Sequence, residues 1–198
     1  MNQKTSWSVI FIATAILTGS SSVMAQTPPK QQPAAQVFAI PQNGITFRTG
    51  DTWQQGAQEM RLYGIQACIR GTSFTNSVGA KQDCGEASLA VFAALVRDTK
   101  PTCSPIAQLP TSNIAKAPTI LVICTAHVGE HSLDLGLVLI TEGYAFAAFT
   151  NDAKPVYMPY LVAEAIAKKK KSGLWSFPDL PHPNIVILNA LKGRTPPP

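Results

Sequence analysis

Two charged residues, Asp51 and Arg61, are the first candidates for chemistry in this sequence. Asp51 lies in the tripeptide Gly50-Asp51-Thr52, and Arg61 begins the stretch of residues 61–69 (RLYGIQACI). Carboxylates are ligands that calcium prefers, and a guanidinium can neutralise charge that builds up on a phosphoryl group. The residues alone also allow a simpler interpretation, in which Asp51 serves a turn and Arg61 pairs with Glu59 on one face of a strand.

Several short motifs, found in order along the chain, together carry a resemblance to a known family. They are Gly50-Asp51-Thr52, Arg61-Leu-Tyr-Gly-Ile65, Cys84-Gly85-Glu86, Asp134-Leu135 with Leu137-Val138, Glu142-Gly143-Tyr144-Ala145, and Tyr160-Leu-Val-Ala-Glu164 followed by Gly173-Leu174-Trp175. In this order and spacing they resemble the staphylococcal-nuclease-like (thermonuclease) domain family, over residues 37–180. The resemblance implies an α+β fold, built as a five-stranded OB-type β-barrel with three helices.

The resemblance also implies phosphodiester hydrolysis with one calcium ion, one activated water and two arginines. Asp51 matches the first calcium aspartate of the family, and Arg61 matches the first phosphate arginine. Gln66 replaces the second calcium aspartate, Ile69 replaces the glutamate that acts on the water, and Thr119 replaces the second arginine. Gln66 keeps an amide oxygen but no charge. Ile69 cannot take a proton, and Thr119 offers no guanidinium.

These three replacements separate two classes of function. Loss of a general base and of a transition-state donor each costs about two to four orders of magnitude in rate. We therefore expect an exported thermonuclease-like protein with a degraded catalytic site, which serves as a non-catalytic binding or structural module without a cofactor. The alternative is a divergent calcium-dependent nuclease that hydrolyses DNA or RNA. Another carboxylate close to Asp51 and Arg61, from Glu59, Asp83 or Glu86, would favour that alternative.

The first residues have the pattern of a secretory signal peptide. A basic head precedes an apolar run at residues 9–17, and small residues end at Ala25, where cleavage is expected. The protein should therefore be exported, to the periplasm or out of the cell, with no stable membrane span after removal of the signal. The expected organisation is a signal peptide at 1–25, a disordered spacer at 26–36, the domain at 37–180 and a proline-rich tail at 181–198.

All four cysteines lie in the exported part of the chain. An even number of cysteines in an exported protein indicates disulfides, and four cysteines allow three pairings. We expect Cys68 to pair with Cys84, which would join the end of the Arg61 strand to the start of a helix. Cys103 should pair with Cys124, joining the exit of that helix to the next strand.

The net charge of +5 is compatible with nucleic acid or another anionic polymer as a partner, without identifying one. Residues 168–171 are four consecutive lysines. We interpret them as a solvated helix end, because positive charge complements the dipole there. The three histidines, His127, His131 and His182, are interpreted as surface residues.

The distribution of apolar residues predicts elements in the order strands, helix, strand, helix, helix. Asp83 should cap a helix that ends at Lys100. Ser132 should cap a second helix that runs through Glu142, and a third helix is expected over 158–171. Strands are expected at 37–40, 45–48, 58–65, 120–124 and 144–149.

Overall fold

The computed structural model describes residues 36–110 and 118–192. The expected signal peptide, most of the spacer and the end of the tail lie outside the described residues. The strands are β1 (Phe38–Ala39), β2 (Ile45–Thr49), β3 (Thr52–Gln55), β4 (Gln58–Leu62), β5 (Ile65–Ala67), β6 (Ser73–Thr75), β7 (Lys81–Asp83), β8 (Thr102–Leu109), β9 (Thr119–Val128), β10 (His131–Asp134) and β11 (Ala145–Ala147). The helices are α1 (Cys84–Thr99), α2 (Leu135–Thr141), α3 (Met158–Lys170), α4 (Pro183–Lys192) and the 3-10 helix η1 (Gly173–Ser176).

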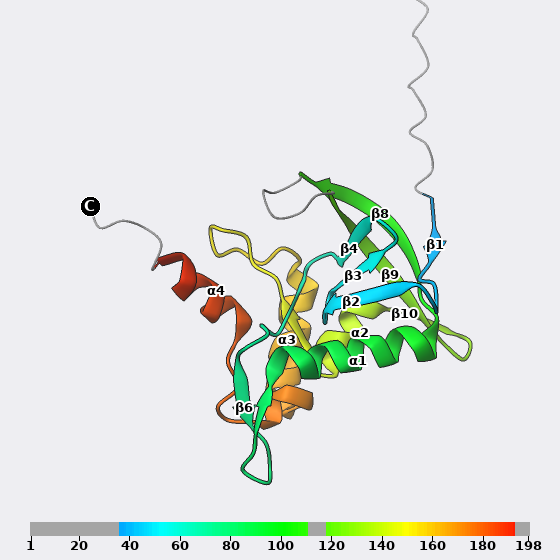
Figure 1. The fold of residues 1–198 in the computed structure, drawn as a ribbon. Coiled ribbons are helices and arrows are strands. Elements are labelled where there is room, and N and C mark those ends of the chain that lie inside the picture. Colours follow the sequence, from blue (N-terminus) through cyan, green and yellow to red (C-terminus); the bar gives the residue numbers. More distant parts are fainter. Residues whose placement is uncertain (1–35, 111–117, 193–198) are drawn as a thin grey trace, which may run out of the picture. The chain divides into compact units, whose positions relative to one another are not determined.

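The fold is α+β, with a curled mixed sheet at its centre (Figure 1). Seven strands form this sheet in the order β1-β8-β9-β4-β3-β2, with β10 paired to β9. The paired strands are antiparallel except β4 and β9, which run parallel. The sheet has seven strands where a five-stranded barrel was expected. The strands expected at 37–40, 45–48, 58–65 and 120–124 belong to it, and the strand expected at 144–149 does not, while β3, β8 and β10 are additional. Two further pairs, β5 with β11 and β6 with β7, lie outside it.

Helix α1 begins and ends where the sequence predicts. The side chain of Asp83 accepts a hydrogen bond from the backbone N–H of Glu86 at 2.9 Å, which caps the first turn. Lys100 closes the helix in the left-handed conformation (φ 42°), and Pro101 follows. Glu86 itself pairs with Arg70 at 3.2 Å.

Helix α2 begins later than expected. Ser132, the expected cap, belongs to strand β10 and pairs with His127 of β9. Asp134 caps the helix instead, by accepting from the backbone N–H of Leu137 at 2.9 Å. The hairpin of β9 and β10 therefore extends the chain to Asp134, and an aspartate is as good a cap as a serine.

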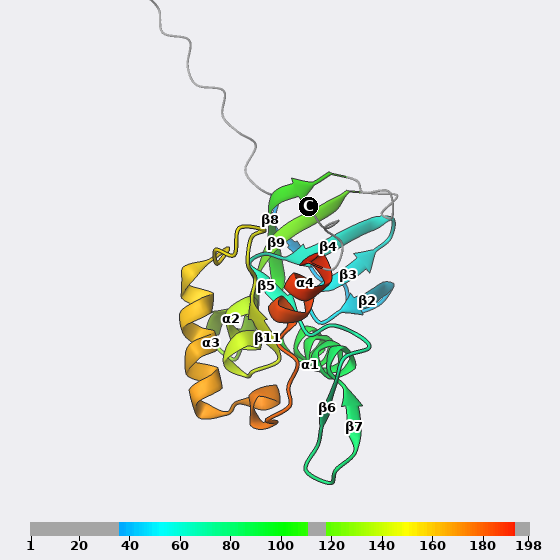
Figure 2. The same ribbon diagram turned by 90° about the vertical axis from the view of Figure 1, so that its left-hand side faces the viewer.

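A fourth helix, α4, lies in the segment at 181–198 that was expected to be a proline-rich tail. Pro183 stands at its first position, where a proline is favourable because its missing N–H has no partner in a helix. Several prolines lie on both sides of α4 in the sequence, and for this reason the sequence predicted a tail and not a helix here. Figure 2 shows α4 beside β5.

The main core lies between the sheet and the helices, around the fully buried Trp53, Phe92 and Leu139. A second cluster surrounds the Cys68–Cys84 disulfide and includes Phe74 and Phe146. Both disulfides have the expected pairing, with Cα–Cα separations of 5.5 Å for Cys68–Cys84 and 4.0 Å for Cys103–Cys124. They indicate an extracellular or otherwise oxidising compartment. In residues 36–110 and 118–192, we find no helix with the length and apolar character that a membrane span needs.

Candidate functional site

The turn between β2 and β3 places Asp51 inside the protein. Gly50 lies directly against α1, because a Cβ atom at this position would be 2.7 Å from the Cβ of Ser88 and 2.8 Å from its carbonyl carbon. Only glycine allows the turn to approach the helix backbone this closely. As a result Asp51 is only 2% exposed, although it belongs to a two-residue turn.

Both carboxylate oxygens of Asp51 have several partners. Oδ1 accepts hydrogen bonds from the hydroxyl groups of Thr49 and Thr52, the latter at 2.9 Å. Oδ2 accepts from the backbone N–H of Ala67 at 3.3 Å. The same oxygen lies 3.2 Å from Nη2 of Arg61. The buried charge of Asp51 is therefore compensated by one guanidinium and three neutral donors.

Arg61 joins Asp51 to Gln66. Its Nη2 donates to Oε1 of Gln66 at 2.8 Å, and Nε2 of Gln66 donates to the backbone oxygen of Ala67 at 3.0 Å. We call these residues, Asp51, Arg61 and Gln66, the arginine cluster. The side chain of Arg61 is 34% exposed and that of Asp51 is 3% exposed, so the cluster is reached from solvent through its arginine.

The arginine cluster does not fit a calcium ion. Calcium takes about six to eight oxygen ligands, preferably with several carboxylates. Here one carboxylate is present, its oxygens already accept hydrogen bonds, and the amide oxygen of Gln66 accepts from Arg61. Among the residues that the structure describes, no group of three or more His, Cys, Asp and Glu side chains could hold a metal ion.

The other residues of the expected site have separate environments. Thr119 pairs with Glu59 across β4 and β9, and its hydroxyl donates to Oε1 of Glu59 at 2.7 Å. The neighbour of Arg61 in this register is Leu121. Ile69 is half-buried, and its carbonyl accepts two hydrogen bonds from Thr72.

The carboxylates that could have rebuilt a metal site also have other partners. Glu59 accepts from Thr119, Asp83 caps α1, and Glu86 pairs with Arg70. The simple pairing of Arg61 with Glu59 is also not what the structure contains, because Arg61 pairs with Asp51. The structure thus brings together Asp51, Arg61 and Gln66, and it places Ile69 and Thr119 in other contacts.

A buried acid–base pair lies at the start of α4, and sequence reasoning missed it. Nε2 of His182 is 2.9 Å from Oε1 of Glu164, and Oε2 of Glu164 accepts from the backbone N–H of Ala147 at 2.6 Å. The side chains of Phe146 and Trp175 lie against the imidazole. His182 is therefore not a surface residue, since its side chain is only 20% exposed. The proline on each side of His182 is the signal that could have indicated a fixed position.

Helix α4 also borders the arginine cluster. A small cavity of about 60 Å³ is lined by Gln66 and by Ile187 and Leu188 of α4. A second cavity of about 240 Å³, mainly apolar, lies next to the pair of Glu164 and His182. The segment that the sequence assigned to a tail therefore forms part of the surroundings of the candidate site.

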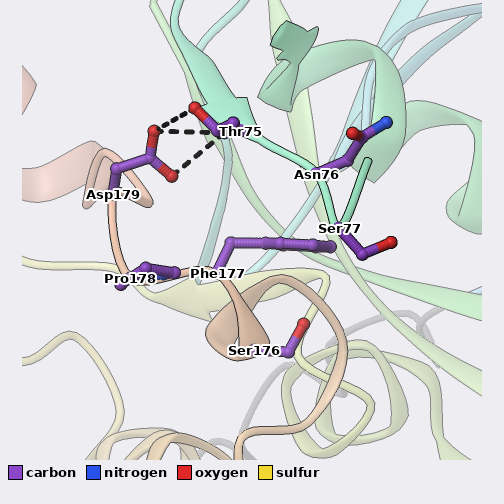
Figure 3. A pocket seen from close by; sticks show the side chains of 7 residues that line it. All are labelled: Thr75, Asn76, Ser77, Ser176, Phe177, Pro178 and Asp179. Atoms are coloured by element: carbon purple, nitrogen blue, oxygen red, sulfur yellow. Dashed lines mark hydrogen bonds between the residues drawn. The ribbon is translucent and has the colours of Figure 1, made fainter. Parts of the chain in front are cut away.

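A further hollow of about 570 Å³ lies between the β6–β7 hairpin and the segment after η1 (Figure 3). Its carboxylate, Asp179, accepts from the backbone N–H of Thr75 at 3.0 and 3.1 Å and from the hydroxyl of Thr75 at 2.7 Å. Nζ of Lys81 lies 3.0 Å away. The hydrogen bond from the backbone of Thr75, then that from its hydroxyl and the interaction with Lys81, keep the pKa of Asp179 well below its usual value. Asp179 therefore holds the β6–β7 hairpin against the segment after η1.

The fold and the site define an α+β protein with two disulfides. A buried aspartate in the turn between β2 and β3 pairs with a partly exposed arginine of β4. Comparison with protein-family models and with curated proteins found no match for this chain.

Proposed function

We propose that this chain is an exported thermonuclease-like domain of the OB-barrel type that does not hydrolyse nucleic acid and acts as a binding or structural module. The curled mixed sheet and the order of the sequence motifs support the family and the barrel. The arginine cluster is the observation that carries the functional part of the proposal.

In the arginine cluster a guanidinium lies between the two residues at the family's calcium positions. Nη2 of Arg61 is 3.2 Å from Asp51 and 2.8 Å from Gln66. A metal ion would have to displace this internal cation and would gain only one charged ligand. An arginine used in this way neutralises Asp51, so it is not free to neutralise a phosphoryl group in a transition state.

The replacement of the family's general base by Ile69 also argues against hydrolysis. Ile69 can neither take a proton nor orient a water, and Thr119 donates to Glu59. With no activated water and no second guanidinium, binding of a nucleic acid would not lead to cleavage. The net charge of +5 favours an anionic polymer as the partner, with nucleic acid as the first candidate.

The test is a nuclease assay on the exported protein, with DNA and RNA and with either calcium or a chelator. We expect no calcium-dependent cleavage, and calorimetry should detect calcium binding only at millimolar affinity or weaker. Calcium-dependent cleavage that is abolished by Arg61→Ala would establish the divergent nuclease instead. Cleavage that survives Arg61→Ala would come from a contaminating enzyme only if a preparation made without the protein cleaves equally, and otherwise it would contradict the proposal.

Restoring activity should need three substitutions together: Gln66→Asp, Ile69→Glu and Thr119→Arg. Gln66→Asp alone supplies a second carboxylate, but Arg61, which already donates to residue 66, would pair with it. Thr119→Arg alone places a guanidinium beside Glu59. Each single variant should therefore remain inactive, and activity of one of them would contradict the proposal.

A further inference from the structure

Helix α3 exposes a line of apolar side chains to solvent. Met158, Val162 and Ile166 are 57%, 54% and 48% exposed. They are spaced four residues apart, so they lie on one side of the helix. We call them the α3 stripe. The buried side of the helix consists of Tyr160, Ala163, Glu164 and Ala167.

The α3 stripe has no cover within the described residues. Figure 2 shows α2 alongside α3, with no other described element over the outer side of α3. The stripe from Met158 to Ile166 is about 12 Å long at 1.5 Å per residue. Three large apolar side chains in one line differ from the singly exposed apolar residues of an ordinary surface.

Four lysines lie at the end of the α3 stripe. Lys168, Lys169, Lys170 and Lys171 are all exposed. In the part of the chain that the structure describes, none of them forms an ion pair with a carboxylate. Nζ of Lys168 lies 5.3 Å from the centre of the Trp175 ring.

Acidic side chains do not balance this charge along the helix. The acidic residue of α3 is Glu164, which is buried and pairs with His182. The neighbouring helix α2 has an acidic residue at each end. Asp134 accepts a hydrogen bond from Tyr160, and Glu142 lies in the turn that contacts Gly173. The helix dipole favours lysines in the last turn, but it gives no reason for an exposed apolar line next to them.

We propose that α3 docks this protein onto the surface of an anionic lipid bilayer. Apolar side chains on a helix that lies in the plane of a membrane enter the boundary between headgroups and acyl chains. Lysines next to them interact with anionic headgroups. The length of the stripe suits shallow insertion, and the four lysines supply the charge complementarity. Binding through α3 should be reversible, because three apolar side chains allow only shallow insertion.

The experiment measures sedimentation of the exported protein with vesicles of phosphatidylcholine and phosphatidylglycerol in equal amounts. The N terminus is checked by mass spectrometry and is the same in all variants, so its contribution cancels. We expect binding to these vesicles, loss of binding at high salt, and no binding to vesicles of phosphatidylcholine alone. Val162→Ser/Ile166→Ser should weaken binding several-fold. Lys169→Gln/Lys170→Gln should weaken it about thirtyfold, since each lysine contributes about 1 kcal/mol near an anionic surface.

Matched controls have the same chemistry at other places. Val78→Ser/Leu109→Ser removes two apolar side chains that are 83% and 41% exposed. Lys100→Gln/Lys192→Gln removes two exposed lysines that, like those of α3, form no ion pair among the described residues. Both controls should bind like the unchanged protein. Equal effects of test and control variants, or equal binding to neutral vesicles, would overturn the proposal. A dimer in light scattering that dissociates in Val162→Ser/Ile166→Ser would also overturn it, because the stripe would then be covered by a second copy.

Discussion

At the scale of single residues, the protein neutralises a buried carboxylate with an arginine from the neighbouring strand. Asp51 is 2% exposed and pairs with Arg61 at 3.2 Å. Removing one member of a buried pair leaves the other charge without compensation, which is costly. Because the Arg61 side chain is 34% exposed, solvent reduces that cost.

The first prediction concerns this pair. Arg61→Met should lower the free energy of unfolding by about 2 kcal/mol, a value reduced for the partial exposure of the arginine. Asp51→Asn/Arg61→Met should lose less than the sum of the two single changes, because the doubly changed protein has no uncompensated charge. Urea unfolding of the four proteins gives this coupling. The control is Arg48→Met, whose guanidinium donates to Gln54 on the exposed side of the sheet. If the effects of Asp51→Asn and Arg61→Met were additive in the double variant, the prediction would be contradicted.

The second prediction concerns the pair of Glu164 and His182. Glu164→Ala should destabilise the protein by about 2–4 kcal/mol, because the buried N–H of Ala147 and the imidazole of His182 both lose their partner. Glu86→Ala breaks the exposed pair with Arg70 and should cost less than about 1 kcal/mol. Thermal or urea unfolding of the two variants measures both losses of stability. Equal losses would show that burial of Glu164 does not matter.

The sequence predicts which residues meet in the arginine cluster, but not how they bond. The resemblance assigns Asp51, Arg61 and Gln66 to one expected site together with Ile69 and Thr119, and the structure brings only the first three together. The resemblance does not show that Arg61 bonds to both Asp51 and Gln66, because that depends on the rotamer of a long side chain and on the position of β5. Nor does it place His182, whose contacts come from α3 and β11 and are far away in the sequence.

At the scale of elements, side chains from one element fix the position of another. The hydroxyl of Tyr160 in α3 donates to Oδ1 and Oδ2 of Asp134 at 2.7 and 2.8 Å, and Asp134 caps α2. Burial, together with this hydrogen bond, raises the pKa of Tyr160 far above its usual value. Asp134 thus both caps α2 and binds the side chain that packs α3 against α2.

The third prediction uses the hairpin of β6 and β7, which Asp179 fastens. A carboxyl group with a lowered folded pKa contributes stability that is fully present above its unfolded pKa, about 3.9, and is lost as the pH falls through the folded pKa. Asp179→Asn should therefore destabilise the protein at pH 7. The difference from the unchanged protein should shrink as the pH falls below about 4.

Two measurements check this prediction. Urea unfolding at several pH values gives the difference in stability. Amide exchange at Thr75, whose N–H donates to Asp179, reports on the hairpin directly and should become faster in the variant at pH 7. A difference in stability that does not change with pH would mean that charge on Asp179 is not responsible.

Among the elements, long helices with clear ends follow from the sequence. The Asp83 cap and the Lys100-Pro101 end define α1, and Gly173 lies just beyond α3. Helix α2 was placed too early, because Ser132 and Asp134 are equally good caps and only the pairing of β10 selects between them. Helix α4 was missed, since its apolar residues Ile185, Val186, Ile187 and Leu188 are consecutive and give no helical period.

At the scale of the whole molecule, two disulfides cross-link distant parts of the chain. Cys68–Cys84 joins the end of β5 to the start of α1, and Cys103–Cys124 joins the neighbouring strands β8 and β9. The fourth prediction is that Cys68→Ala/Cys84→Ala lowers the free energy of unfolding by about 3 kcal/mol, as the chain-entropy estimate gives for a loop of this size. Cys103→Ala/Cys124→Ala, whose loop is of similar length with a separation of 21 against 16 residues, should have a similar effect. Chemical denaturation under oxidising conditions measures both. A variant as stable as the unchanged protein would contradict the prediction.

The parallel pairing of β4 with β9 has a consequence for how the chain folds. Strands β2, β3 and β4 pair as local hairpins, and β8 pairs with β9, which follows it in the chain after residues 110–118. In contrast, Met60 meets Ile120 across β4 and β9, so about 60 residues separate the partners. Contacts of such long range form slowly, because loop closure must precede them. We therefore expect two early-forming halves and a late, rate-limiting joining step, during which the edges of β4 and β9 are open to pairing with other chains.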